Sequence, residues 1–248
     1  MRAQVVYIFH NCFLLHTGEQ TLLFDCPAPQ YLPKRSAAAL APELRGRNVT
    51  AFVSHSHTDH CHPDLASVCA EAASARFVFS DDVADLYPQS VPPGALVLEP
   101  DQTGGIDGIG IETLASNDLG LAFVLEVEGL RVYHGGDLAA WVWDTASAAE
   151  KAFTAGFFSA ALERIAQKPV DLAFTNVDRR LPNLAGGPEF ARKVRPRVLV
   201  PMHAFGRTAW LADVAQALAA GGSSVFLYRR PGDRLDLPDG ITATKDQA

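Results

Sequence analysis

The residues best suited to chemistry lie in the segment VSHSHTDHCHP, residues 53–63, which contains four of the chain's eight histidines. His55 and His57 are two residues apart on an extended segment, so both side chains can point the same way. Two neutral imidazoles on one side supply half of a tetrahedral zinc site. Asp59 and His60 follow after the chain turns, and they are suited to a second metal ion beside the first. Imidazole and carboxylate ligands favour zinc, manganese or iron, and no thiolate is needed.

The elements that must position this segment are a strand before it and a helix after it. The apolar run at 49–54 predicts a buried strand, and Pro63 near the start of an Ala- and Leu-containing stretch predicts a helix over 62–73. Other strands are expected at 3–9, 12–17, 20–26, 75–80, 95–99, 109–115, 121–128, 130–137, 170–176, 197–202 and 223–228. Other helices are expected at 81–87, 146–167, 187–194 and 208–220, with a short one in the proline-containing stretch 27–48. Two β-rich halves packed sheet to sheet, with helices outside, satisfy this order.

The composition is that of an ordinary globular protein. Of 248 residues, 48% are hydrophobic and 20% charged, no low-complexity linker divides the chain, and we expect a single domain over residues 1–248. The net charge of -7, without runs of Lys or Arg, makes a nucleic-acid partner unexpected. No stretch is long enough to span a membrane, and the N-terminus is predicted to be a strand and not a signal peptide. Four cysteines without a CxxC pair favour reduced thiols and a cytoplasmic location.

HSHTDH resembles the signature of the metallo-β-lactamase superfamily, and other motifs follow that family's order over nearly the whole chain. LLFDCP, YHGGD and VLVPMHAFG resemble its strands that end in Asp25, Asp137 and His203. HNCFLLHTGEQTLLFD is similar to the branch that contains lactonase-like hydrolases, and YHGGDLAAWVW to bacterial members of that branch. The resemblance implies an α/β (α+β) fold, the four-layer αββα sandwich. It also implies that Asp137 bridges two metals, that His203 binds the second one, and that Asp25 holds the histidine loop through hydrogen bonds.

The chain departs from the family pattern at one position. The third histidine that normally completes the first metal's ligands is missing from LASNDLGLAF, where Asn117 and Asp118 take the matching place. Asp118 is the better candidate, because a carboxylate is a normal zinc or manganese ligand and an amide is a weak one. His134 is an alternative ligand if Gly135 and Gly136 bend the chain, and otherwise a packed or supporting residue. The predicted metal ligands are His55, His57, Asp59, His60, Asp118, Asp137 and His203.

Several further residues have two readings each. His10 either lines the pocket or packs in the core, and Trp141 and Trp143 either form a wall of the substrate pocket or pack beneath a loop. Asp178 and Arg179 lie either at the rim of the site, where the arginine would hold an anionic substrate, or in a solvated turn. Cys61 and His62 are expected at the surface or behind the ligands, and His16 is expected to be an ordinary strand residue.

The function that these residues indicate is metal-assisted hydrolysis of a small molecule. Two zinc-type ions would activate a water against a carbonyl or phosphoryl centre, with a lactone or phosphoester as the expected substrate. Asp59 is expected to orient the attacking group as well as bind metal, and His134 and His10 are the candidates for protonating the leaving atom. The alternative is a metal-binding or sensing protein that has lost turnover, which the missing histidine motivates. Metal content and hydrolysis of a substrate panel separate the two.

Overall fold

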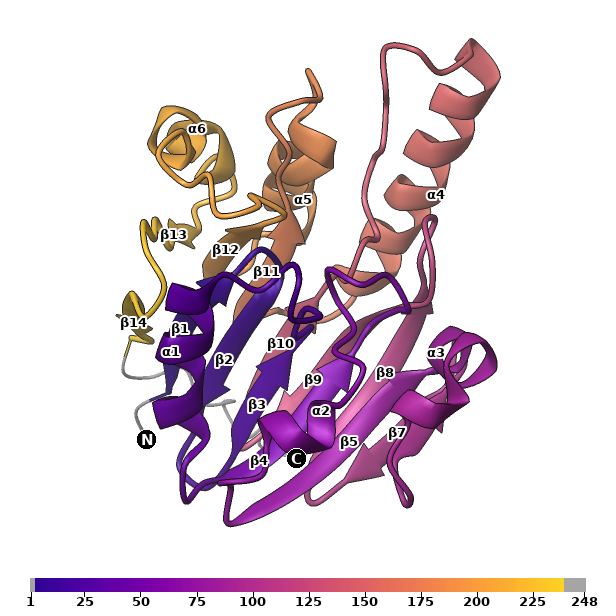
Figure 1. The fold of residues 1–248 in the computed structure, drawn as a ribbon. Coiled ribbons are helices and arrows are strands. Elements are labelled where there is room, and N and C mark those ends of the chain that lie inside the picture. The colour runs from indigo at the N-terminus through magenta and orange to yellow at the C-terminus, as the bar shows by residue number, and fades with distance from the viewer. Residues whose placement is uncertain (1–2, 239–248) are drawn as a thin grey trace, which may run out of the picture.

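Two seven-stranded sheets packed face to face make up the framework of the computed structural model, which describes residues 3–238 (Figure 1). The first sheet contains, in spatial order, β14 (Arg234–Asp236), β1 (Gln4–Phe9), β2 (Cys12–His16), β3 (Thr21–Phe24), β4 (Asn48–Val53), β5 (Ser74–Ser80) and β6 (Leu96–Leu98). The second contains β13 (Ser224–Val225), β12 (Val198–Met202), β11 (Leu172–Asn176), β10 (Leu130–His134), β9 (Leu121–Val127), β8 (Ile109–Ala115) and β7 (Thr103–Ile106).

Helices cover the outer faces of both sheets. The first sheet carries α1 (Lys34–Leu44), α2 (Leu65–Val68) and α3 (Asp81–Leu86), with a short 3-10 turn at Pro88–Ser90. The second carries α4 (Ala148–Ile165), α5 (Gly187–Val194) and α6 (Leu211–Leu218), with a 3-10 turn at Leu184–Gly186. The layer order is therefore helix, sheet, sheet, helix, and the predicted four-layer αββα sandwich is confirmed. Among the helices of residues 3–238, none is both long and apolar enough to cross a membrane.

The alternation of side chains along the strands separates the inner core from the helix contacts. On β10, His134 points between the sheets and stacks on Phe24 of β3, whereas its neighbour Tyr133 points outward and stacks on Phe190 of α5. Successive strand residues face opposite sides of a sheet, so one short strand serves both layers. Rings from both sheets, including Phe52 and Phe123, fill the space between them. This packing fixes the distance at which the loops of the two sheets meet.

Strand direction brings the loops with chemistry to one edge. β3 and β4 are parallel neighbours in the first sheet, and β10, β11 and β12 are parallel neighbours in the second. The segments that follow these strands carry the motif residues, and parallel strands end at the same edge of their sheet. The loops after β4, β10 and β12 therefore face one another across the sandwich.

The structure differs from the sequence-based expectation at four elements. The helix expected over 62–73 is only the four-residue α2, because the backbone around residues 70–73 is taken by tertiary bonds: Gly46 N–H donates to Glu71 O, and Ala73 N–H donates to Arg47 O. The strand expected at 223–228 is assigned only to Ser224–Val225. The short edge strands β7 and β14 were not predicted, since neither has a strong alternating pattern.

The C-terminal part of the described chain returns to the first sheet and is tied to it by an ion-pair network. The Glu43 carboxylate of α1 accepts hydrogen bonds from Arg234 of β14, and it lies 2.9 Å from His16 Nε2 of β2. Burial acts to raise the pKa of Glu43, but its bonds to Arg234 and His16 outweigh it and lower the pKa. His16 is thus more than an ordinary strand residue, since it joins three elements.

We expect Glu43→Gln to destabilise the fold by roughly 1–2 kcal/mol near neutral pH, because charged hydrogen bonds are about twice as strong as neutral ones. The lowered pKa means that the stabilisation is complete above the ordinary glutamate value of about 4.3 and disappears as the pH falls through the folded-state pKa. Urea unfolding at pH 7 and at pH 3 measures both effects.

The matched control is Glu71→Gln, because Glu71 and Arg45 form a pair whose side chains are 62% and 68% exposed. An exposed pair of this kind contributes only about 0–1 kcal/mol. Equal losses in the two variants at pH 7, or a Glu43→Gln loss that does not shrink between pH 7 and pH 3, would contradict the role assigned to the network.

Candidate metal centre

The loop after β4 begins the site with two imidazoles in contact. His55 Nε2 lies 3.1 Å from His57 Nδ1, as the extended spacing of the two residues predicts. The His55 ring is fully buried, and its Nδ1 lies 2.9 Å from Ser54 Oγ, which fixes its orientation. The His57 side chain is 47% exposed and forms the open side of the pair.

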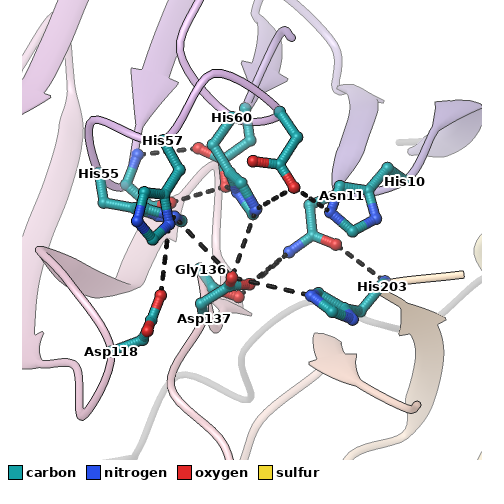
Figure 2. A network of polar contacts seen from close by, with 12 residues as sticks. His10, Asn11, His55, His57, His60, Asp118, Gly136, Asp137 and His203 are labelled. Carbon is teal, nitrogen blue, oxygen red and sulfur yellow. Dashed lines mark hydrogen bonds and ion pairs between the residues drawn. The ribbon is translucent and has the colours of Figure 1, made fainter. Parts of the chain in front are cut away.

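Asp137 lies at the centre of the cluster, as Figure 2 shows. Its Oδ2 atom is 3.8 Å from His55 Nε2, 3.5 Å from His60 Nε2 and 3.8 Å from His203 Nε2. Three imidazole nitrogens from both sheets therefore converge on one carboxylate oxygen. Asp137 is therefore within reach of a cation that these imidazoles would hold, and the bridging role that the resemblance implies for it stays a prediction.

Asp118, the candidate for the missing third histidine, lies beside His55 and His57. Its Oδ2 atom lies 3.4 Å from His57 Nδ1, and one ligand atom each from His55, His57, Asp118 and Asp137 lie within 4.8 Å of one another. Asn117 is turned away: its amide donates to Ala139 O and Thr154 Oγ1 and accepts from Ala139 N–H. Of the two residues that the sequence left open, only Asp118 is oriented toward the histidines.

The approach of this loop to His55 depends on a glycine. Leu121 N–H donates to Ser54 O at 2.8 Å, which brings residues 116–121 directly against the histidine loop. Gly120 has a φ of +60°, and a Cβ atom there would collide with Ser54 O and lie 2.7 Å from His55 Cβ. A residue without a side chain is therefore required for Asp118 to reach its place.

A second group of ligands lies on the other side of Asp137. His10, Asp59 and His60 bring ligand atoms within 4.8 Å of one another, and His10 Nε2 is 3.3 Å from Asp59 Oδ2. His203 completes this side through its contact with Asp137. His10 is fully buried and stacks on Phe205 at 3.9 Å between ring centroids. His10 is therefore packed inside the site, with its ring against Asp59 and Phe205, and it is not among the residues that line the neighbouring cavity.

Asp25 supports the histidine loop from behind, as the resemblance implies. Its Oδ1 accepts from Ser54 N–H at 2.8 Å, and its Oδ2 accepts from Ser54 Oγ at 2.7 Å and lies 2.9 Å from His60 Nδ1. These contacts leave His60 Nε2 facing Asp137.

A strained backbone conformation, with positive φ, occurs at three residues of the site: His10, Asp25 and His203. Such strain is often found at functional sites.

Asn11 is an organising residue that sequence reasoning missed. From the turn between β1 and β2, its amide donates to Asp137 Oδ1 and Gly136 O, both at 3.2 Å, and its Oδ1 accepts from His203 N–H at 2.8 Å. Asn176 adds a second amide bond to Gly136 O at 2.8 Å. Only the packing of the two sheets brings these residues together, so the sequence around Asn11 carried no signal for this role.

His134 lies behind the site and not in it. The ring is fully buried and stacked on Phe24 at 4.6 Å, its Nε2 is 3.3 Å from Asn11 O, and its Nδ1 accepts from Gly136 N–H. Both ring nitrogens therefore have partners away from Asp137. This geometry favours the supporting reading over a ligand or proton-donor role, and the catalytic role predicted for His134 remains untested.

Burial keeps two of the imidazoles, those of His55 and His60, neutral and makes the central carboxylate costly to ionise. Burial lowers the pKa of His55 and His60 well below the ordinary value, so both present free lone pairs to a cation. Burial also raises the pKa of Asp137 to about 7. Burial acts to raise the pKa of Asp59, but the hydrogen bond to His10 and the other contacts of the carboxylate together outweigh burial, and the pKa is lowered.

This donor set fits metal ions. His60 Nε2 is buried without a hydrogen-bond partner in the described part of the chain, although it points at Asp137. A lone pair left free beside a buried carboxylate is costly unless a cation occupies the space between them. Neutral imidazoles with carboxylates are the ligands that zinc, manganese and iron accept.

The remaining motif residues fall into two groups, one beside His203 and one away from the ligands. The buried Asp178 carboxylate lies 3.1 Å from His203 Nδ1, so Asp178 belongs to the site and not to a solvated turn. Trp141 donates from Nε1 to Asp137 O, its ring lies 5.0 Å from that of His203, and together with Trp143 it packs against the buried residues Ala139, Leu181 and Ala185. Cys61 is buried, and His62 Nδ1 accepts from Asp64 N–H at the start of α2, so neither reaches the ligands.

Comparison with known proteins agrees with this arrangement. A family model described as the β-lactamase superfamily domain matches residues 4–152, more than half of the 248-residue chain. The chain belongs to this superfamily. The matched region contains every predicted ligand except His203, which lies beyond it.

Several known proteins resemble the chain over almost its full length. A protein of Symbiobacterium thermophilum named as a metal-dependent hydrolase is 27% identical, over 94% of this chain and 100% of its own. A metallo hydrolase from the archaeon Ignicoccus hospitalis superposes with a TM-score of 0.64 at 17% identity, covering 96% of this chain and 99% of its own. A metallo-β-lactamase fold protein from Bacillus subtilis also has a TM-score of 0.64, at 13% identity and 95% and 99% coverage. At these identities the two solved structures bear on the fold alone.

We expect Gly120→Ala to destabilise this superfamily member by roughly 2–4 kcal/mol, through about 1–2 kcal/mol of backbone strain and a further overpacking cost against Ser54 and His55. Urea unfolding measures the loss, and zinc titration of the folded variant should show weakened binding as His55 and Asp118 are pushed apart.

Gly46→Ala is the control, since Gly46 has a φ of +67° but nothing within 4 Å of the added methyl group. It should lose only the strain, about 1–2 kcal/mol. If the two variants are equally stable and bind zinc equally, the close approach of the 116–121 loop to His55 is not required.

Proposed function

We propose that the chain is a metal-dependent hydrolase with a dinuclear, zinc-type centre that acts on a lactone or phosphoester. His55, His57 and Asp118 would hold the first ion, Asp59, His60 and His203 the second, and Asp137 both. The observation that carries this proposal is the convergence of three imidazole nitrogens, at 3.5–3.8 Å, on one oxygen of Asp137. The relative from Symbiobacterium thermophilum, named as a metal-dependent hydrolase, supports the same class of activity.

Residues of the site would have separate roles in the proposed hydrolysis. When bound, such ions lower the pKa of a water to near 7 and polarise the substrate's carbonyl or phosphoryl oxygen. Asp59, whose Oδ2 atom lies 3.3 Å from His10 Nε2, would accept a hydrogen bond from the attacking water and orient it. Asp178 accepts a hydrogen bond from His203 Nδ1, which keeps Nε2 of the same ring free to face the centre. Asn11 holds Asp137 and His203 in register with each other.

The competing proposal, a metal-binding or sensing protein without turnover, rested on the missing histidine. The position of Asp118 beside His57 weakens that motive, because a carboxylate supplies the ligand that the histidine would have supplied. Zinc remains the metal we propose, with manganese or iron as the alternatives that the same ligands accept.

The proposed setting is the cytoplasm, with a small-molecule substrate and without nucleic acid. Four unpaired cysteines, all buried, suit a reducing compartment. The net charge of -7 disfavours binding to a polyanion.

We expect the purified protein to bind two equivalents of zinc and to lose hydrolysis of a lactone and phosphodiester panel on treatment with a chelator. Asp118→Ala should weaken one zinc equivalent by at least roughly 10–100-fold, since that is the loss caused by removing even a residue that only supports a ligand, and leave the other tight. Calorimetric zinc titration distinguishes the two ions, and Asp118→His should restore the weakened one.

Asp144→Ala is the control, since Asp144 is an exposed acid outside the cluster. It should bind zinc as the unmodified protein does. Two tight zinc ions without turnover of any substrate would favour the sensing alternative, and unchanged zinc binding in Asp118→Ala would remove Asp118 from the centre.

A further inference from the structure

A cavity of about 510 Å³ opens beside the metal centre on the side of His203. Its lining includes His203 and Asp178 from the site and Phe205 from the segment after β12. A molecule held there has its reacting end at His203 and Asp137, because His203 belongs to both the cavity wall and the cluster. The cavity is therefore the space in which the rest of a substrate would lie.

The charge of this cavity is opposite to that of the chain. Arg179, Arg180 and Arg207 line it together with a single carboxylate, Asp178, while the whole protein has a net charge of -7. Three arginines beside one aspartate make a local excess of positive charge. Such a concentration at the mouth of a site attracts anions and raises their local concentration.

The three arginines are not equivalent. Arg180 donates from Nε to both oxygens of Asp178 at 3.0 Å, and its guanidinium lies 5.2 Å from the ring centre of Trp143 and 5.3 Å from that of Phe205. Its charge is already paired and its position fixed by two rings. Arg180 thus builds the wall and is not free to bind an anion.

Arg179 and Arg207 remain available. Both side chains are exposed, and neither has an acidic partner among residues 3–238. A guanidinium presents a planar set of donors that matches a carboxylate or phosphate. Phe205, 38% exposed, lies in the same wall and offers an apolar surface next to these donors.

We propose that the substrate carries a second, non-reacting anionic group, a carboxylate or a phosphate next to an apolar portion, which Arg179 and Arg207 bind while the scissile bond lies at Asp137. This proposal rests on the proposed hydrolase function and narrows it to anionic esters, lactones or phosphoesters. Arg179 and Arg207 are then specificity-determining residues, distinct from the metal ligands.

Binding of small probes to the zinc-loaded protein tests the arginines without requiring turnover. Calorimetric titrations with benzoate and with phenylphosphonate, which has no ester bond to hydrolyse, compare the two anionic groups, and benzyl alcohol is the neutral probe. Arg179→Gln and Arg207→Gln should each weaken the preferred anion about ten-fold, equivalent to about 1.4 kcal/mol, and leave benzyl alcohol unchanged. The anion that binds the unmodified protein more tightly shows which charged group, carboxylate or phosphate type, the site prefers in a substrate.

Arg192→Gln is the matched control, because Arg192 is an exposed arginine of α5 that does not line the cavity. It removes the same charge and should leave all three probes unaffected. Equal anion affinities in the unmodified protein, the two cavity variants and the control would overturn the proposal.

Turnover supplies the second measurement. The para-nitrophenyl esters of glutarate and of valerate have equal chain lengths, and only the first ends in a carboxylate. The ratio of kcat/KM for the anionic over the neutral ester should fall about ten-fold in each cavity variant and stay constant in Arg192→Gln. If the enzyme is active and the ratio does not change, the arginine proposal alone is overturned. If neither ester shows metal-dependent turnover, the result counts against the hydrolase function, and the binding titrations decide on the arginines.

Discussion

The buried charge of Asp137 is the constraint on which the rest of the site depends. A carboxylate at 6% exposure is costly to ionise unless hydrogen bonds and cations surround it, and its pKa, raised to about 7 by burial, expresses that cost. Asn11 donates to one oxygen, and three imidazole nitrogens face the other. Metal ions would turn this cost into binding energy, because they favour the ionised carboxylate and the neutral imidazoles at the same time.

The two sheets of the sandwich act as separate supports that have to meet at Asp137. The first supplies the histidine loop, held from behind by both oxygens of Asp25. The second supplies Asp137 and His203 at the ends of parallel strands. Asn11 reaches from the first sheet to two loops of the second, donating to Asp137 and accepting from His203, so the register of the sheets sets the geometry of the centre. The aromatic core between the sheets keeps that register.

The metal-binding cluster and the cavity beside it differ in charge. The cluster gathers carboxylates and neutral imidazoles for cations, while the adjoining cavity presents arginines within an acidic protein. Asp178 joins the two regions, since it accepts from His203 on one side and from Arg180 on the other. A single buried carboxylate thereby links the orientation of a proposed ligand to the wall of the substrate space.

The sequence by itself determined the class of site and the order of the strands that carry it. Spacing of two residues on an extended chain makes His55 and His57 neighbours, and a local rule of this kind needs no tertiary information. Long, regular elements such as the helix at 146–167 were equally predictable, whereas the helix expected at 62–73 was lost to bonds from Gly46 and Arg47. Only the tertiary structure decided that Asp118 and not Asn117 turns toward the histidines, that His134 lies behind them, and that Asn11 joins the loops. The physical reason is distance along the chain: these contacts join residues about 60 to 190 positions apart, and they exist only because two packed sheets bring their loop ends together.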